Sequence, residues 1–377
     1  MILEQPPVWF ILIAFVCALG PLIVIHELGH YWVARLFGVG AETFSIGFGR
    51  QILGWTDKRG TRWKVGWLPL GGYVKFVGDE DAASTSATDT QLTPEDQQRS
   101  FQLKPVWQRF LIVLAGPMAN FILAILIFAA FFASIGVPRT NNNVVALQPG
   151  SPAEVAGVKP GDHVISIADR STPTFEDITK VVLIRPLERV PLVVERGGHT
   201  VTLEIVIGAH EQVDRFGQHF RIGRIGILGG ERTFVRLSAA ELIPAAASYT
   251  LSTTVGMVDF LWQIVSGRRS VKDLGGPIKI AQIAGQQASL GLPDFILLVA
   301  LLSINLGFIN LLPVPMLDGG HLFFYAIEAV RRRPLSAEAL DWAFRGGLAL
   351  ILALLVFVTF NDLGSLGLWD GLQRLIG

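Results

Sequence analysis

Four long stretches without a charged residue constrain the fold of this chain more than any other feature. They occupy residues 7–25, 110–137, 295–312 and 347–360, and charged residues make up only 16% of all 377 residues. A helix that crosses a bilayer needs about 20 mostly apolar residues, so each stretch is long enough once its flanks are included. The sequence therefore predicts a polytopic α-helical membrane protein with about four transmembrane helices.

Basic residues predict how these spans are oriented. No Lys or Arg precedes the first span, ten lie between the first and the second, and four lie between the third and the fourth, at 331–333 and 345. Loops rich in Lys and Arg stay in the cytoplasm. We therefore expect both of these connections in the cytoplasm, and both chain ends and the long segment 138–293 outside.

The first apolar stretch runs directly into a short motif, His26-Glu27-Leu28-Gly29-His30. Residues four apart share a helix face, so the two imidazoles can reach one metal ion. Glu27 can then reach a metal-bound water as a general base. The alternative is a histidine pair held by hydrogen bonds in a helix bundle. Because an ionisable group at membrane depth costs roughly 2.5–3.5 kcal/mol, we favour a site for one zinc ion.

A catalytic zinc ion usually takes three protein ligands. Asp318 follows the third apolar stretch, where Pro313 and Pro315 end the helix and a glycine pair permits close backbone approach. In a four-span topology the first and third spans run in the same direction, so this carboxylate can meet the two imidazoles. A helix cap is the alternative role for Asp318, and His321 is the alternative third ligand.

One further uncharged stretch, residues 242–258, contains a proline and five Ser or Thr residues. We expect an amphipathic helix that lies on the protein or on the outer membrane surface. A fifth crossing at this point would put Asp318 and His26 on opposite sides of the membrane.

Three segments together resemble the site-2 protease family of intramembrane zinc metalloproteases. They are residues 26–30, Ala115-Gly-Pro-Met-Ala-Asn-Phe121, and Asn310-Leu-Leu-Pro-Val-Pro-Met-Leu-Asp-Gly-Gly320. Residues 275–281, 301–312 and 360–362 are similar to the bacterial branch, the regulator-of-sigma-E proteases, and the resemblance covers nearly the whole chain. It implies zinc bound by His26, His30 and Asp318, Glu27 as the catalytic base, and contacts of Asn310 and Asn305 with substrate or transition state. Interhelical hydrogen bonding is the alternative role for both asparagines.

Two further segments indicate how a substrate is held. Residues 44–77 alternate apolar and polar residues, which predicts an amphipathic hairpin with Gly71-Gly72 as its turn. Such a hairpin could pair with an unwound substrate strand; an ordinary cytoplasmic hairpin with interfacial tryptophans is the alternative.

Residues 79–100 are polar and are expected to be flexible. Residues 142–208 combine a short helix stopped by Gly157, a Pro160-Gly161 turn and strands at 190–195 and 200–207, and resemble a single PDZ domain of the bacterial kind.

The resemblance and the spans together predict eight segments. These are 1–37, the first transmembrane helix with the histidine motif; 38–109, a cytoplasmic-side, membrane-associated β-hairpin loop and flexible segment; 110–137, the second transmembrane helix; 138–210, an inserted periplasmic PDZ domain of α/β type; 211–292, periplasmic strands and amphipathic helices; 293–320, the third transmembrane helix with Leu-Asp-Gly-Gly; 321–345, a cytoplasmic segment; and 346–377, the fourth transmembrane helix and C-terminal tail.

The leading functional hypothesis is an intramembrane zinc endopeptidase of the bacterial inner membrane, with its active site towards the cytoplasm. Its expected substrates are single-span membrane proteins already cut by another protease, such as anti-sigma factors and remnant signal peptides. Its other expected partners are the lipid bilayer and a peptide chain end that binds the PDZ domain. With 31 basic and 31 acidic residues, nothing indicates a nucleic-acid partner. The alternatives are a catalytically inactive PDZ membrane scaffold and a zinc transporter, neither of which needs Glu27.

Overall fold

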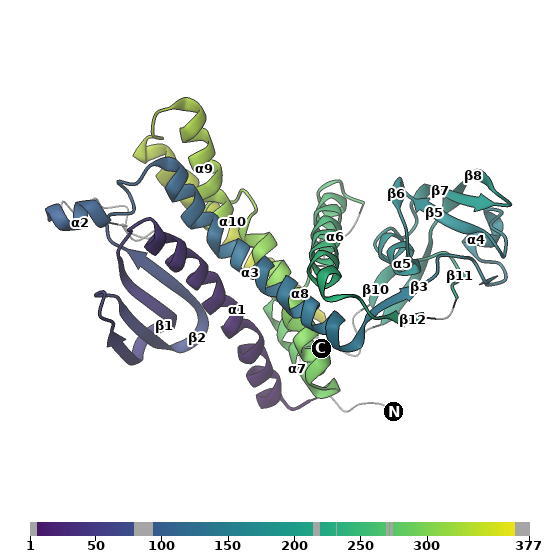
Figure 1. The fold of residues 1–377 in the computed structure, drawn as a ribbon, viewed down its shortest axis with the longest axis horizontal. Helices are drawn as coiled ribbons and strands as arrows, with labels where there is room; N and C mark the ends of the chain where they lie inside the picture. Colours follow the sequence, from purple (N-terminus) through teal and green to yellow (C-terminus); the bar gives the residue numbers. More distant parts are fainter. Residues whose placement is uncertain are drawn as a thin grey trace, which may run out of the picture. The chain divides into compact units, whose positions relative to one another are not determined.

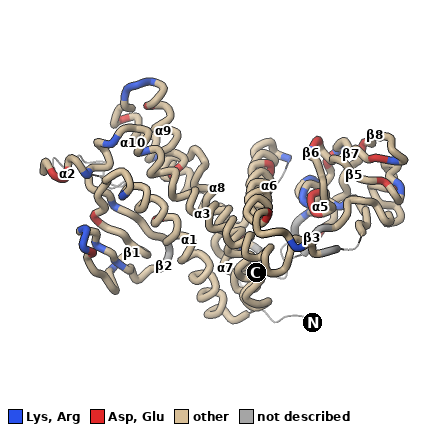
Figure 2. Tube along the Cα trace, viewed as in Figure 1, with Lys and Arg blue, Asp and Glu red and all other residues tan. Residues whose placement is uncertain are grey.

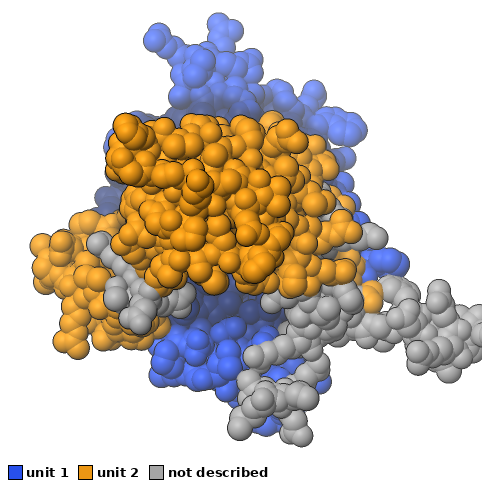
Figure 3. Space-filling model, turned by 90° about the vertical axis from the view of Figure 1, so that its right-hand side faces the viewer, with its two compact units in different colours: residues 1–128, 275–360 blue, residues 129–274, 361–377 orange. Residues whose placement is uncertain are grey.

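The computed structural model describes residues 6–78, 93–213, 219–230, 232–268, 271 and 274–365 (Figure 1). It divides into two compact units, residues 1–128 with 275–360 (unit 1) and residues 129–274 with 361–377 (unit 2), which Figure 3 shows in different colours. Most of the predicted flexible excursion, residues 79–92, lies outside the described residues, and residues 94–99 form a short helix, α2 (Pro94–Arg99).

Four helices among the described residues are long and apolar enough to cross a membrane, which confirms the four predicted spans. They are α1 (Val8–Leu36), α3 (Val106–Ile135), α8 (Leu292–Asn310) and α10 (Ala337–Ser365). Charged residues are sparse along these four helices (Figure 2), as a lipid environment favours.

Helices α1 and α8 pack against each other in unit 1. Ala14 and Ala18 of α1 share a buried cluster with Phe295 and Leu298 near the start of α8, while the later part of α1 meets the chain just after α8. Helices α1 and α8 therefore run in the same direction, as expected. Helix α7 (Pro277–Leu290) joins the same cluster through Ala284. It falls in segment 211–292, for which the sequence predicts periplasmic strands and amphipathic helices, yet it packs against the first span.

An antiparallel hairpin of β1 (Ala41–Thr56) and β2 (Arg62–Phe76) follows α1. The predicted turn at Gly71-Gly72 is wrong, because the chain turns at 57–61, where the Asp57 carboxylate accepts hydrogen bonds from the backbone of Arg59 and Thr61. The two glycines lie inside β2. Gly71 has a φ of +111° and faces the Phe48 ring, and both positions allow close approach rather than a turn.

Aromatic rings hold the hairpin against α1. Tyr31 of α1 packs edge-on against Phe44 and Trp63, and these two rings stack with their centroids 4.4 Å apart. Further along the hairpin, large apolar side chains are exposed, including Ile52 and Trp67. The hairpin is thus anchored to α1 through Phe44 and Trp63, and it exposes apolar side chains elsewhere.

Seven residues connect α8 to α9 (Asp318–Arg331) in unit 1. The connection folds back tightly: a Cβ atom on Gly319 would lie 2.3 Å from the Leu312 carbonyl oxygen, and one on Gly320 would lie 2.4 Å from that of Val314. Met316 takes a left-handed backbone conformation with φ of +81°. This connection places Asp318 at the first turn of α9.

Unit 2 contains an antiparallel sheet of four strands in the order β6-β5-β7-β8, with helix α5 beside it. Its core includes Ile167, Ile178, Leu192 and Ile205. The predicted strands at 190–195 and 200–207 correspond to β7 and β8. The elements of this unit before its last helix are β3 (Val137–Thr140), β4 (Ala146–Leu147), α4 (Pro152–Val155), β5 (His163–Ile167), β6 (Arg170–Ser171), α5 (Phe175–Leu183), β7 (Arg189–Arg196), β8 (His199–Val206), β9 (Gly208–Val213), β10 (His219–Arg224), β11 (Ile227–Leu228) and β12 (Arg232–Val235).

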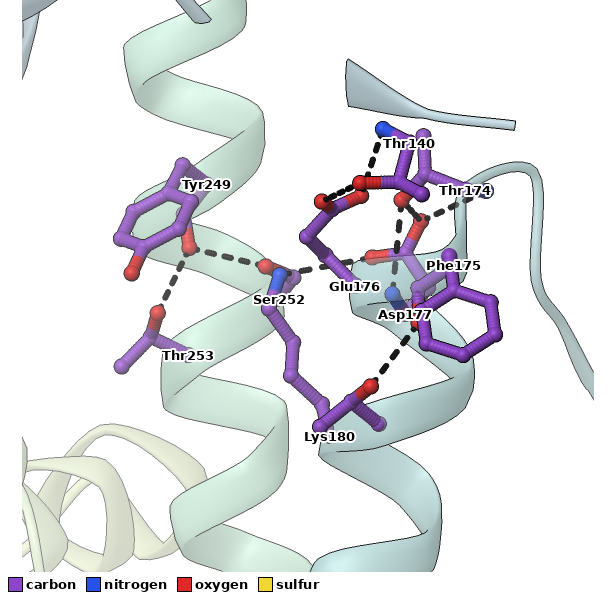
Figure 4. A network of polar contacts seen from close by, with 10 residues as sticks. Thr140, Thr174, Phe175, Glu176, Asp177, Lys180, Tyr249, Ser252 and Thr253 are labelled. Atoms are coloured by element: carbon purple, nitrogen blue, oxygen red, sulfur yellow. Dashed lines mark hydrogen bonds and ion pairs between the residues drawn. The ribbon is translucent and has the colours of Figure 1, made fainter. Parts of the chain in front are cut away.

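The stretch predicted as an amphipathic helix forms part of α6 (Ala239–Val265), which is not among the four candidate spans. Figure 4 shows α6 beside α5, where the Lys180 ammonium lies 4.8 Å from the centre of the Tyr249 ring. Asp259 of α6 also pairs with the buried Arg185 and, at 3.4 Å, with Arg170. On the other side of α6, exposed apolar residues recur at helical spacing: Ile243, Leu251, Val255, Val258, Trp262 and Val265.

Candidate metal centre

Three side chains from two distant parts of the sequence meet in unit 1. The Nε2 atoms of His26 and His30 are 3.2 Å apart, and Asp318 Oδ2 lies 3.0 Å from the first and 3.4 Å from the second. These residues form a group able to hold a metal ion among the described residues. The sequence predicted this set, and the structure brings its members together.

The separations of these atoms suit zinc. Three donors at about 2.0–2.1 Å from a tetrahedral zinc ion stand about 3.3 Å from one another. Two imidazoles and one carboxylate are a usual donor set for a catalytic zinc ion. Asp318 Oδ2 is buried and, among the described residues, faces only the two imidazole nitrogens. The residues present therefore fit the metal that the sequence predicts.

Helix α3 runs antiparallel to α1 and orients the His30 imidazole. His30 Nδ1 lies 2.9 Å from the carbonyl oxygen of Ile112. A carbonyl only accepts, so His30 donates its Nδ1–H and keeps the lone pair of Nε2 free for a metal. A Cβ atom on Gly116 would lie 2.2 Å from that Nε2, and one on Gly29 would lie 2.4 Å from the Ala115 carbonyl oxygen. Glycine at both positions allows the two helices to approach closely.

His26 also has a contact from α3. The Asn120 amide nitrogen lies 3.2 Å from His26 Nδ1, and the Asn120 side chain is completely buried. Ser303 of α8 donates its hydroxyl to the Asn120 backbone carbonyl at 2.8 Å. Asn120 thus lies where α1, α3 and α8 meet.

Glu27 lies between the histidines and the hairpin. The backbone N–H of Val74 in β2 hydrogen-bonds its carboxylate. A Cβ atom on Gly72 would lie 3.3 Å from Glu27 Cγ. The second strand of the hairpin therefore runs directly beside the carboxylate that the sequence predicts to be the general base.

The remaining predicted residues lie at different distances from the cluster. The Asn310 amide nitrogen is 3.5 Å from His26 Nε2, at the end of α8. Asn305 makes no hydrogen bond to the cluster among the described residues. His321 is not a member of the group, since its ring packs against Phe344 and Tyr325. The structure thus favours Asp318 over His321 as the third ligand.

Three residues of the second and third spans support the metal group but were not assigned a role from the sequence: Gly116, Asn120 and Ser303. For two of these residues the sequence does contain a signal. Gly116 and Asn120 are four residues apart, so they share one helix face, and a glycine and an amide inside an apolar span mark a helix contact.

Comparisons with known proteins show which proteins this chain resembles. A family model described as peptidase family M50 matches residues 14–354, which include the whole cluster. A protein of Agrobacterium fabrum whose name assigns it as a zinc metalloprotease is 44% identical over 361 residues, covering 94% of this chain and 96% of the relative. Metalloprotease MmpA of Caulobacter vibrioides is 40% identical over 379 aligned residues, covering 93% of this chain and 95% of the relative.

Proposed function

The chain belongs to peptidase family M50 and is a zinc metalloprotease, and we propose that it is an endopeptidase that cleaves the transmembrane segments of single-span membrane proteins. The observation that carries this proposal is the convergence of His26, His30 and Asp318 beside apolar helices long enough to span a membrane. Ionisable groups at membrane depth are costly. A protease that acted only on soluble chains would gain nothing from placing its metal ligands there.

Each residue of the site has a proposed role. His26, His30 and Asp318 hold one zinc ion, which when bound supplies Lewis acidity to a carbonyl group and to water. Glu27 takes the proton of the attacking water and passes it to the leaving amine. The Asn310 amide, beside His26, donates a hydrogen bond to the oxyanion of the substrate. Asn305, five residues earlier on α8, contacts the substrate away from the metal.

The β1–β2 hairpin holds the substrate in an extended form. A helix hides its peptide bonds within its own hydrogen bonds, so a transmembrane substrate must unwind before it is cut. Strand β2 lies against Glu27 through Val74 and Gly72, so a substrate segment added to this hairpin would pass close to the base. The exposed Ile52 and Trp67 suit a hairpin that dips into the membrane interface.

The distribution of basic residues supports an orientation with the metal site towards the cytoplasm of a bacterial inner membrane. Most of the Lys and Arg near the spans lie in two places: the segment between α1 and α3, which contains the hairpin, and the loop after α9 (Figure 2). Unit 2 then faces the periplasm. Its sheet, with α5 beside it and the short β4–β11 pair, supports a PDZ domain that receives a peptide chain end. The apolar side of α6 suits the outer membrane surface.

These features support a role in regulated intramembrane proteolysis, with anti-sigma factors and remnant signal peptides as the substrate classes. A site among membrane spans accepts a short single span more readily than a large folded domain, so a previous cut by another protease prepares the substrate.

A reconstituted cleavage assay tests this function. The full chain is placed in lipid vesicles with a single-span protein that has lost its periplasmic domain, and the products are mapped by mass spectrometry. We expect a cut within the apolar segment, its loss after treatment with a zinc chelator, and its return when zinc is added. Cuts confined to the soluble flanks, or cleavage that continues without zinc, would contradict the proposal.

A further inference from the structure

We infer that Asn120 is a positioning residue for His26, and that its amide oxygen accepts the proton on His26 Nδ1 when Nε2 serves the metal. This inference rests on the proposed function, because it assigns the residue that presents one of the proposed ligands. It concerns a side chain that touches neither the metal nor the substrate.

The Asn120 amide is buried beside His26. Asn120 has 0% of its surface exposed, and its nitrogen lies 3.2 Å from His26 Nδ1. Its Oδ1 atom is buried and has no hydrogen-bond partner among the described residues. A buried polar atom without a partner is rare and calls for an explanation.

The protonation of a metal-bound imidazole requires a partner for its second nitrogen. A neutral imidazole carries one proton, so a histidine that offers the lone pair of Nε2 to a metal carries its proton on Nδ1. That proton needs an acceptor, and metal-bound histidines almost always have one in a carboxylate, a carbonyl or water. For His30 the acceptor is the Ile112 carbonyl. For His26 the side chain at this position is Asn120.

The shape of the amide allows either of its ends to face His26. Its oxygen and nitrogen ends are alike in size, so a half-turn about the last side-chain bond exchanges them. The turn brings Oδ1 to His26 Nδ1 without moving the backbone. That backbone is held by the Ser303 hydroxyl, which donates a hydrogen bond to the Asn120 carbonyl. Asn120 can therefore accept the imidazole proton at the same place where its nitrogen now lies.

The test compares an acceptor, a non-acceptor and a packing control in the purified full chain. Asn120→Asp retains an acceptor of the same size, Asn120→Leu has a similar size without one, and Ser303→Ala weakens the same helix contact while leaving the amide in place. Zinc affinity is measured by competition with a chelator, and the cobalt-substituted proteins are compared by their visible absorption spectra.

We expect Asn120→Leu to lower zinc affinity about 10- to 100-fold, the usual effect of losing a partner of a metal-bound histidine, and to change the cobalt spectrum. Asn120→Asp and Ser303→Ala should stay within about threefold of the parent. A packing role predicts the reverse order, because leucine fits an apolar interior better than a carboxylate does. If Asn120→Leu does not fold, as judged by gel filtration in detergent, Asn120→Ala takes its place with the same expected order.

The inference is overturned if Asn120→Leu binds zinc like the parent, if Asn120→Asp is as weak as Asn120→Leu, or if Ser303→Ala loses as much affinity. Asp318→Asn separates this failure from failure of the proposed function. If the metal site itself is misassigned, Asp318→Asn leaves zinc affinity unchanged. If only the role of Asn120 is wrong, Asp318→Asn loses zinc while Asn120→Leu keeps it.

Discussion

Replacing Glu27 by glutamine is expected to lower the rate of peptide-bond cleavage by about 10²- to 10⁴-fold, the range that general acid–base catalysis contributes. Glutamine has nearly the same shape but cannot take a proton from water at neutral pH. Zinc content should remain at the parent level, because Glu27 is not one of the three residues that form the metal group. Cleavage rate and zinc content are measured on the same purified sample.

The same substitution separates the protease from the two alternatives. A scaffold that only recruits partners, or a transporter that only moves zinc, would keep its activity in Glu27→Gln. The matched control is Glu95→Gln, the same chemical change at an exposed position of α2. Full cleavage by Glu27→Gln, or an equal loss in Glu95→Gln, would contradict the assigned role.

Replacing Gly116 by alanine is expected to displace His30 and so to lower zinc affinity. Removal of a partner of a metal ligand lowers metal affinity about 10- to 100-fold, and we expect a loss at least as large here. The added methyl group would lie 2.2 Å from Nε2 and 2.4 Å from Cε1 of the ring. The ring cannot simply tilt away, since its other nitrogen is held by the Ile112 carbonyl. Zinc affinity by chelator competition measures the effect.

A second glycine in a span serves as the control for this change. A Cβ atom on Gly20 of α1 would meet nothing within 4 Å. Gly20→Ala should therefore keep the parent zinc affinity and, through better helix propensity, stabilise the fold slightly, by about 0.5–1 kcal/mol. Parent-like zinc binding by Gly116→Ala would show that the close contact does not constrain His30.

The spans and the metal ligands could be predicted because their signals are local. Each span is an uncharged run of sufficient length, and His26 and His30 are one helical turn apart. Asp318 was accessible for a different reason: the two prolines and two glycines before and after it indicate a chain that turns back at the end of a span. These patterns do not depend on which helices are neighbours.

The supporting contacts could not be predicted in the same way, because they depend on which helix faces meet. The second span is apolar on every side, so periodicity does not tell which side faces α1. Only the packed structure shows Asn120 beside His26 and Gly116 beside His30. The hairpin turn was misplaced for a related reason. Gly71 and Gly72 permit a close approach to Phe48 and Glu27, and a glycine pair needed for contact looks the same in sequence as one needed for a turn.

Residues 26, 30 and 318 are proposed to bind one zinc ion together. X-ray absorption at the zinc edge, combined with metal analysis of the purified full chain, tests this proposal most directly. We expect one zinc ion per chain with two imidazole nitrogens and a carboxylate oxygen among its donors, and a changed spectrum or lost metal in Asp318→Asn. Absence of zinc from the active protein, or a zinc spectrum identical in the parent and in Asp318→Asn, would contradict it.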